Sequence, residues 1–225
     1  MDNMNNNLTK DVLYCNYQDT FPLASRIGSE VVIGKESLKG IDKAVSIFGG
    51  ARAKPESWEY VQSYELALAL AKKGISVISG GGPGIMEAAN RGAKDANNEA
   101  AKAIGLNINI KAELNTKEHQ DISVYFEHFA SRKVTFCAHS DAFVVAPGGL
   151  GTLDELFEVL TLIQTHKNEV VPVILLGDKF WGGMLNWIKE TMVDSGLVSQ
   201  AHFELMEVAK DWQEAIEILE KKKII

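Results

Sequence analysis

The sequence has few cysteines, no long hydrophobic run and no long run of positive charge. Its two cysteines, Cys15 and Cys137, are too few and too far apart for a disulfide framework, so we expect both to be reduced and not to bind a metal. The longest apolar run, residues 170–176, is far shorter than the roughly 20 residues of a membrane-spanning helix. The amino terminus lacks the basic and apolar regions of a signal peptide. We therefore expect a cytoplasmic protein with no membrane segment.

Basic residues are outnumbered by acidic ones, which gives a formal net charge of −7. The longest basic run is residues 221–223, and such a chain lacks the positive patch that a nucleic-acid backbone requires. We therefore expect no nucleic-acid partner. The composition, with 46% hydrophobic and 24% charged residues, is ordinary for a globular protein. A chain of this length forms one large domain without a disulfide or a metal.

Short β-branched apolar runs alternate along the chain with longer segments of helical periodicity. This alternation predicts an α/β fold, a doubly wound and mainly parallel sheet of about seven strands with helices on both faces. The expected strands are residues 44–48, 75–79, 103–110, 122–126, 141–146, 170–176 and 203–208. The expected helices are residues 23–38, 55–73, 84–96, 129–139, 152–166, 180–194 and 211–222. We expect residues 1–22 to be flexible and residues 23–225 to form a single domain, because no linker rich in proline, glycine or serine divides them.

Three loops that follow expected strands contain glycine, and ligands of parallel sheets bind at this end of the strands. The loops are residues 49–52, 80–84 and 147–152. Glycine between a strand and a helix lets an anion approach bare backbone N–H groups at the positive end of the helix dipole. The alternative for each loop is a turn that needs glycine only for its backbone conformation. Three such loops in one sheet favour a phosphate-bearing ligand, with Gly81 and Gly82 of the second loop among its candidate contacts.

Several common catalytic motifs are absent. No glycine loop matches the Gly-x-Gly-x-x-Gly dinucleotide motif or the P-loop. The chain also lacks a His-Glu-x-x-His zinc pair and a Gly-x-Ser-x-Gly elbow. These absences disfavour a dinucleotide dehydrogenase, a P-loop ATPase, a zinc hydrolase and a serine hydrolase.

Thr152 and Glu155 have two possible roles at the start of the helix that follows the third loop. The Thr-x-x-Glu spacing is that of a capping box, in which both side chains satisfy free N–H groups of the first turn. Alternatively, Glu155 stands beside a bound phosphate, which requires a nearby cation or a catalytic need for the carboxylate. Arg132 is the candidate cation, although the ordinary position for such an arginine is a solvated helix surface. Sequence separation alone does not establish that Arg132 and Glu155 meet.

Two segments resemble the signature of the LOG ("lonely guy") family. Residues 131–133 (Ser-Arg-Lys) and 147–155 (Pro-Gly-Gly-Leu-Gly-Thr-Leu-Asp-Glu) match its Arg-Lys pair and its PGGxGTxxE motif. Residues 46–52 and 80–90 are similar to the longer bacterial branch, so the resemblance extends over roughly residues 43–174. It implies a Rossmann-like homodimer without a cofactor. The implied activity is hydrolysis of the N-glycosidic bond of nucleoside 5′-monophosphates, either AMP or N6-modified AMP, to free base and ribose 5-phosphate. In many members this reaction activates cytokinins.

The resemblance also implies roles for individual residues. The catalytic pair is Arg132 and Glu155. The implied substrate and phosphate contacts are Lys133, Gly148, Gly149, Gly151, Thr152 and Glu113. The residues before Arg132 depart from the Met-His-x of the short plant-type members, which leaves open whether the base is adenine, N6-modified adenine or a pyrimidine.

Two other functions remain to be weighed against this hydrolysis. Members of the family are often labelled lysine decarboxylases, but this sequence contains no motif for a pyridoxal-binding lysine or its pyridinium partner. The second is a carrier that binds a nucleotide or a phosphorylated cofactor without turnover. The presence of both Arg132 and Glu155 argues against a carrier, because holding a phosphate does not require a carboxylate.

Overall fold

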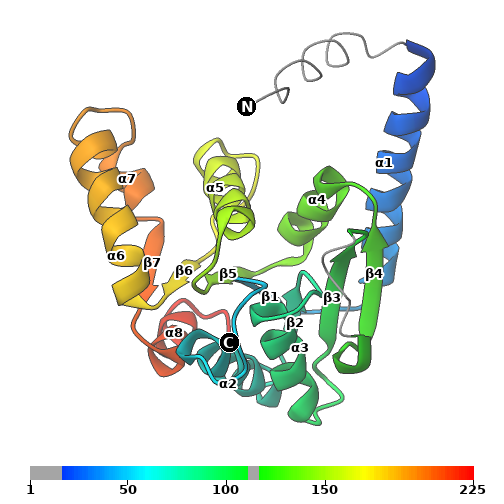
Figure 1. Cartoon of the computed structure of the whole chain (residues 1–225), viewed down its shortest axis with the longest axis horizontal. Coiled ribbons are helices and arrows are strands. Elements are labelled where there is room, and N and C mark those ends of the chain that lie inside the picture. The colour runs from blue at the N-terminus through cyan, green and yellow to red at the C-terminus, as the bar shows by residue number, and fades with distance from the viewer. Residues whose placement is uncertain (1–16, 111–116) are drawn as a thin grey trace, which may run out of the picture.

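A seven-stranded sheet forms the centre of the molecule in this computed structural model, which describes residues 17–110 and 117–225 (Figure 1). The strands are β1 (Ala44–Phe48), β2 (Ser76–Ser79), β3 (Ala103–Ile108), β4 (Ile122–Phe126), β5 (Ala142–Val145), β6 (Val173–Leu176) and β7 (Met206–Ala209). Every neighbouring pair is parallel, in the order β4-β3-β2-β1-β5-β6-β7. All side chains of β1, β2, β3, β5 and β6 are buried, as a sheet covered on both faces requires. The predicted α/β fold class is confirmed.

Helices connect the strands, and most of them lie where the sequence predicts them. They are α1 (Tyr17–Ser37), α2 (Trp58–Lys72), α3 (Ile85–Asp95), α4 (Phe129–His139), α5 (Leu150–Gln164), α6 (Asp178–Trp187), α7 (Gln200–Phe203) and α8 (Trp212–Lys221). Helix α6 continues as a π-helix, η2 (Ile188–Val193), and η1 (Lys117–His119) is a 3-10 turn. The sequence did not predict α7 and η1, each only about one turn long. Helix α1 begins at Tyr17, earlier than expected, and residues 1–16 of the expected flexible segment lie outside the described residues.

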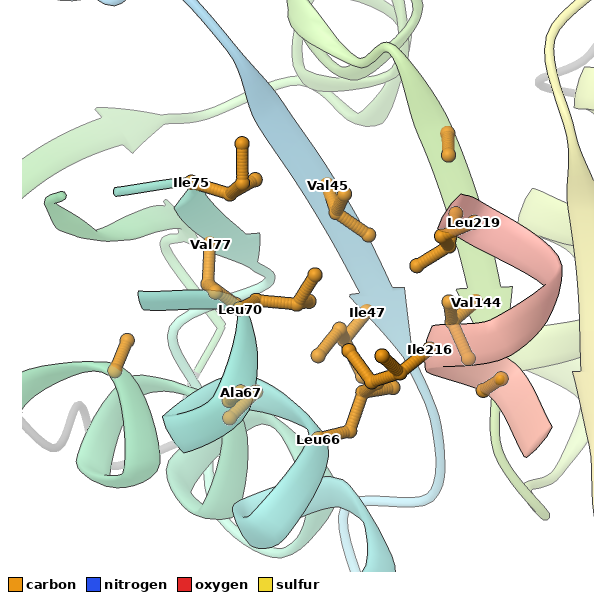
Figure 2. Close-up of a cluster of buried hydrophobic side chains, with 14 of the residues drawn as sticks. Val45, Ile47, Leu66, Ala67, Leu70, Ile75, Val77, Val144, Ile216 and Leu219 are labelled. Carbon is orange, nitrogen blue, oxygen red and sulfur yellow. The ribbon is translucent and has the colours of Figure 1, made fainter. Parts of the chain in front are cut away.

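The hydrophobic core consists of two clusters, one on each face of the sheet. On one face, Leu66 and Leu70 of α2 and Leu219 of α8 pack towards Val45 and Ile47 of β1 (Figure 2). On the other face, the cluster contains side chains of α4, α5 and α6. Because apolar helices cover both faces, the sheet is doubly wound, as in Rossmann-like folds.

Helix α1 lies at one edge of the molecule, where it packs against α4 and the edge strand β4 (Figure 1). No sequence pattern indicates this position. Among the described helices, none combines the length and the apolar character needed to cross a membrane.

The direction of winding reverses between β1 and β5. From β1 the chain adds β2, β3 and β4 on one side, and from β5 it adds β6 and β7 on the other. The loops that leave the carboxyl ends of β1 and β5 therefore diverge to opposite faces and leave a crevice between them. The first and third glycine loops border this crevice.

The packing of α2 on β1 yields a stability prediction. We expect Leu70→Ala to lower the free energy of unfolding by about 2–5 kcal/mol, because it leaves a cavity among fully buried side chains. Val61→Ala on the same helix removes a side chain that is 42% exposed and is expected to change stability by less than about 1 kcal/mol. Urea unfolding of the two variants measures the difference, and equal losses would contradict this description of the core.

Candidate active site

A cavity of about 750 Å³ opens at the carboxyl ends of β1 and β5. It is lined by all four residues of the first glycine loop (49–52), by Gly80 and Pro83 of the second, and by residues 147–152 of the third. The loops are joined through Gly50. Its N–H donates to the Pro147 carbonyl at 3.0 Å, and its own carbonyl accepts from the Ile85 N–H at 3.1 Å. The fold thus brings together three glycine loops that lie far apart in the sequence.

The third loop has the form of an anion-binding helix start. Gly149 is the N-cap of α5, and the N–H groups of Gly148 and Gly149 donate no hydrogen bond within the described part of the chain. The first helical turn adds further N–H groups that have no intrahelical acceptor. A Cβ on Gly149 or Gly151 would meet no atom within 4 Å, so this surface faces open space, whereas a Cβ on Gly148 would lie 2.9 Å from the Gly50 nitrogen. A phosphate can therefore approach the backbone closely.

Thr152 and Glu155 do not form a capping box. Helix α5 begins at Leu150, two residues earlier than the sequence predicts, because the extended backbone of Gly149 already caps it. Thr152 consequently lies inside the first turn and Glu155 one turn further on, where neither side chain can reach the free N–H groups as a box would. Both residues line the cavity.

Arg132 of α4 contacts Glu155 inside the cavity. Its Nη2 donates to Glu155 Oε1 at 3.4 Å, and each side chain is only 10% exposed. The Arg132 Nε has no hydrogen-bond partner among the described residues. The rings of Phe129 and Phe136 lie 5.1 and 5.9 Å from its guanidinium carbon and hold the group by cation–π contact. A buried guanidinium with donors to spare fits a site that receives an anion.

Burial raises the pKa of the Glu155 carboxyl above its usual value. The positive charges of Arg132 and Lys133 oppose this rise, and the negative charges of Asp154 and Glu158 add to it. A carboxyl group with a raised pKa on the wall of a cavity is characteristic of acid–base sites. Cys137, by contrast, is no candidate nucleophile, because burial raises the pKa of its thiol to about 11 and leaves little thiolate.

Three of the residues predicted to bind substrate do not line the cavity. Lys133 is absent from the cavity wall, although its Nζ donates to Asp154, which lines the wall, at 2.8 Å, and also to Glu158 at 2.6 Å. Adjacent helical residues face different directions, so Lys133 joins α4 to α5 beside the site while Arg132 enters it. Gly81 and Gly82 are also not among the residues that line the cavity, whereas their neighbours Gly80 and Pro83 line it. Glu113 and Cys15 lie outside the described residues.

Gly81 is held by a network of buried amides. Its N–H donates to Ser79 Oγ at 3.0 Å, and its carbonyl accepts from Gln120 Nε2 at 3.2 Å. Asn107 completes the network, because its Nδ2 donates to Gln120 Oε1 at 3.1 Å. The backbone groups of Gly81 are therefore already used and its φ is +73°, which glycine adopts without strain. The N–H of Gly81 is therefore not presented to the cavity.

Sequence reasoning missed several parts of the site. It did not indicate that Phe129, Phe136 and Met86 belong to the apolar part of the wall, nor that Asn107 and Gln120 support the second loop. Asn107 carried a usable signal, since an asparagine inside an apolar strand must find buried partners. Among the described residues, no three histidine, cysteine, aspartate or glutamate side chains gather as a metal site.

These features define a Rossmann-like α/β protein whose cavity combines a glycine-lined helix start with a buried Arg–Glu pair. The family model described as "Possible lysine decarboxylase" matches residues 86–219, well over half of the chain. The chain therefore belongs to this family, the LOG family that its sequence motifs indicate.

Two relatives agree with this membership, and a solved structure shares the fold. The cytokinin riboside 5′-monophosphate phosphoribohydrolase LOG3 of Arabidopsis thaliana is 25% identical over 84% of this chain and 86% of its own. A cytokinin riboside 5′-monophosphate phosphoribohydrolase of Mycobacterium tuberculosis is 37% identical over 38% of this chain and 45% of its own. The molybdenum cofactor binding protein of Rippkaea orientalis shares the fold, with a TM-score of 0.55 and 23% identity over 81% of this chain and 98% of that one.

The contact between Arg132 and Glu155 predicts a measurable titration. We expect the Glu155 carboxyl to titrate above the usual glutamate range, and Arg132→Ala to raise its pKa further, because the nearest positive charge that stabilises the carboxylate is lost. Carbon-13 NMR of the side-chain carboxyl across a pH series measures both values. An unchanged or lowered pKa in Arg132→Ala would show that the two groups do not interact.

Proposed function

We propose that this protein hydrolyses the N-glycosidic bond of nucleoside 5′-monophosphates and releases the free base and ribose 5-phosphate. The observation that carries the proposal is the buried contact of Arg132 with Glu155 next to the glycine-lined helix start. The activity for which the plant and mycobacterial relatives are named supports the same reaction class. Their names also make N6-modified adenine the first base to test beside adenine.

In this proposal the 5′-phosphate binds at the backbone of Gly148, Gly149 and Gly151 with Thr152. Residues Gly151 and Glu155 are four apart on α5, so the carboxylate follows the phosphate site by about 6 Å along the helix axis. The ribose then lies over the first turn with its anomeric carbon near Glu155. The apolar wall of Phe129, Phe136 and Met86 offers a surface for the base.

The chemistry follows from the charge that develops on the sugar. As the bond between the anomeric carbon and the base nitrogen breaks, positive charge grows on the ribose ring, and the Glu155 carboxylate stabilises it. The same carboxylate orients a water molecule and takes one of its protons as the oxygen attacks the anomeric carbon. The base leaves with the bonding electron pair and takes up one proton from solvent, and Glu155 then returns its proton to solvent, so one water is consumed for each bond broken. Arg132 binds the substrate and balances the negative charge of Glu155.

A carrier without turnover is the second candidate. The molybdenum cofactor binding protein, whose fold this chain shares, is the reason to consider a carrier. That likeness shows a shared fold and no more. Incubation of the purified protein with AMP, N6-isopentenyl AMP and the other nucleoside monophosphates separates the two functions. Release of free base supports hydrolysis, and binding without release supports the carrier.

Glu155→Gln and Arg132→Ala are each expected to lower turnover by roughly 10²-fold or more, because general acid–base and charge-balancing groups contribute on this scale. Glutamine preserves the shape of Glu155 but can neither hold the negative charge nor take the proton. Initial rates of base release with the best nucleotide measure the effect.

Glu217→Gln is the matched control, because Glu217 is exposed on α8 and does not line the cavity. It is expected to keep the activity of the unsubstituted protein. Circular dichroism confirms that all three variants are folded. Near-normal base release by Glu155→Gln or Arg132→Ala would remove that residue from the mechanism.

We also propose that the protein is a homodimer whose contact includes the outer face of α5. Leu150 is 85% exposed and Phe157 41% exposed, and with Leu153 and Leu162 they line an apolar groove. Exposed apolar groups gathered on one helix face are typical of a protein interface. The predicted partner of this face is a second copy of the chain.

Phe157→Glu is expected to shift the protein from dimer to monomer, because it buries a charge in the proposed interface. Leu197→Glu is the control, since Leu197 is 73% exposed and does not line the groove. Sedimentation velocity of the unsubstituted protein and both variants gives the masses. A monomeric unsubstituted protein, or a Phe157→Glu variant that stays dimeric, would contradict this interface.

A further inference from the structure

The helix that carries Arg132 is not capped by its own residues. His128 is the N-cap of α4, but its side chain makes no capping hydrogen bond. The acceptor comes instead from α1, 98 positions earlier in the sequence. Oε2 of Glu30 accepts from the His128 N–H at 3.3 Å and from the Ser131 hydroxyl, and its Oε1 lies 2.9 Å from His128 Nδ1.

Glu30 is suited to this task by its charge and its environment. Its side chain is only 13% exposed. Although burial acts to raise the pKa of its carboxyl, the hydrogen bonds from Ser131 and His128 outweigh burial and lower it. The group therefore stays ionised, and a negative charge at a helix N-terminus is favourable.

A second contact lies one turn further along both helices. Gly34 of α1 packs so closely on Thr135 of α4 that a Cβ on Gly34 would lie 2.6 Å from Thr135 Oγ1. Glu30 and Gly34 are four residues apart on α1, and Ser131 and Thr135 are four apart on α4. Two anchors separated by one turn fix both the rotation and the axial position of α4.

Arg132 follows Ser131 directly in the first turn of α4, which Glu30 anchors. The position of this turn therefore determines the position of the Arg132 guanidinium. Its Nη2 lies 3.4 Å from Glu155 Oε1, near the limit of a hydrogen bond, and no second hydrogen bond joins the two side chains among the described residues. We propose that Glu30 is a positioning residue that holds Arg132 against Glu155, which gives α1 a part in the reaction although none of its described side chains lines the cavity. This inference rests on the proposed function.

The experiment compares Glu30→Ala, Glu30→Gln and Glu36→Ala. Alanine removes the cap, whereas glutamine keeps one oxygen that can accept from the His128 N–H and the Ser131 hydroxyl. Glu36 lies on the same helix with its side chain 65% exposed and serves as the control. The readouts are the pKa of the Glu155 carboxyl by carbon-13 NMR, and kcat and KM for base release.

We expect Glu30→Ala to raise the pKa of Glu155 as Arg132 withdraws, and to lower kcat about 10-fold or more, since small displacements of catalytic groups are costly. The charged groups that act on Glu155 are Arg132, Lys133, Asp154 and Glu158. Deleting the negative charge of Glu30 would by itself lower the pKa of Glu155, so a rise reports the position of Arg132. Glu30→Gln is expected to recover most of the lost rate and Glu36→Ala to match the unsubstituted protein.

The two proposals fail in different ways. If the unsubstituted protein releases no base, the proposed function is wrong, and the Glu155 titration still decides whether Glu30 positions Arg132. If Glu30→Ala melts at a lower temperature while the pKa of Glu155 and kcat are unchanged, Glu30 is only a structural cap and the inference is overturned. Should Glu30→Ala not fold, Ser131→Ala removes one of the same hydrogen bonds, and an unchanged Glu155 pKa there has the same meaning.

Discussion

A single contact between a buried guanidinium and a buried carboxylate determines what this cavity can do. Glu155 would be costly to keep ionised in such a site without Arg132, and Arg132 would be equally costly without a negative charge nearby. The pair is nevertheless incompletely satisfied, because only one hydrogen bond joins the two groups among the described residues. The other donors of Arg132 make no hydrogen bond among the described residues, which distinguishes this arrangement from a closed structural ion pair. The aromatic rings around the guanidinium hold it without using those donors.

The fold supplies both partners from the point where the sheet reverses its winding. Helix α5 follows β5 and brings Glu155 together with the glycine-capped N-terminus, so the free N–H groups and the carboxylate are fixed on one rigid element. Helix α4 precedes β5 and brings Arg132 from the same face of the sheet. Lys133, the neighbour of Arg132, binds Asp154 and Glu158 of α5 from outside the cavity. The two adjacent basic residues thus have different roles. Arg132 lies inside the cavity, and Lys133 links α4 to α5 by ion pairs.

The strands and the glycine loops could be predicted because their signals are local. β-Branched runs, helical periodicity and the Pro-Gly-Gly-x-Gly-Thr sequence each act over a few residues, and the parallel topology then places their loops at one edge. The contact of Arg132 with Glu155 spans 23 positions and was assigned only through the family resemblance. Gly81 and Gly82 were chosen because they are glycines, but tertiary hydrogen bonds had already used the backbone of Gly81. Glu30 could not be found at all, since nothing in its local sequence indicates a helix start 98 residues away.

The buried amides of Asn107 and Gln120 have a consequence for how a ligand enters. These amides form hydrogen bonds that hold the backbone of the second glycine loop. Gly80 and Pro83 are therefore kept on the cavity wall by contacts that do not involve a ligand. A wall that is already ordered loses little conformational entropy when a molecule arrives. The structure therefore favours a preformed binding site at the second glycine loop over a site that closes around its ligand.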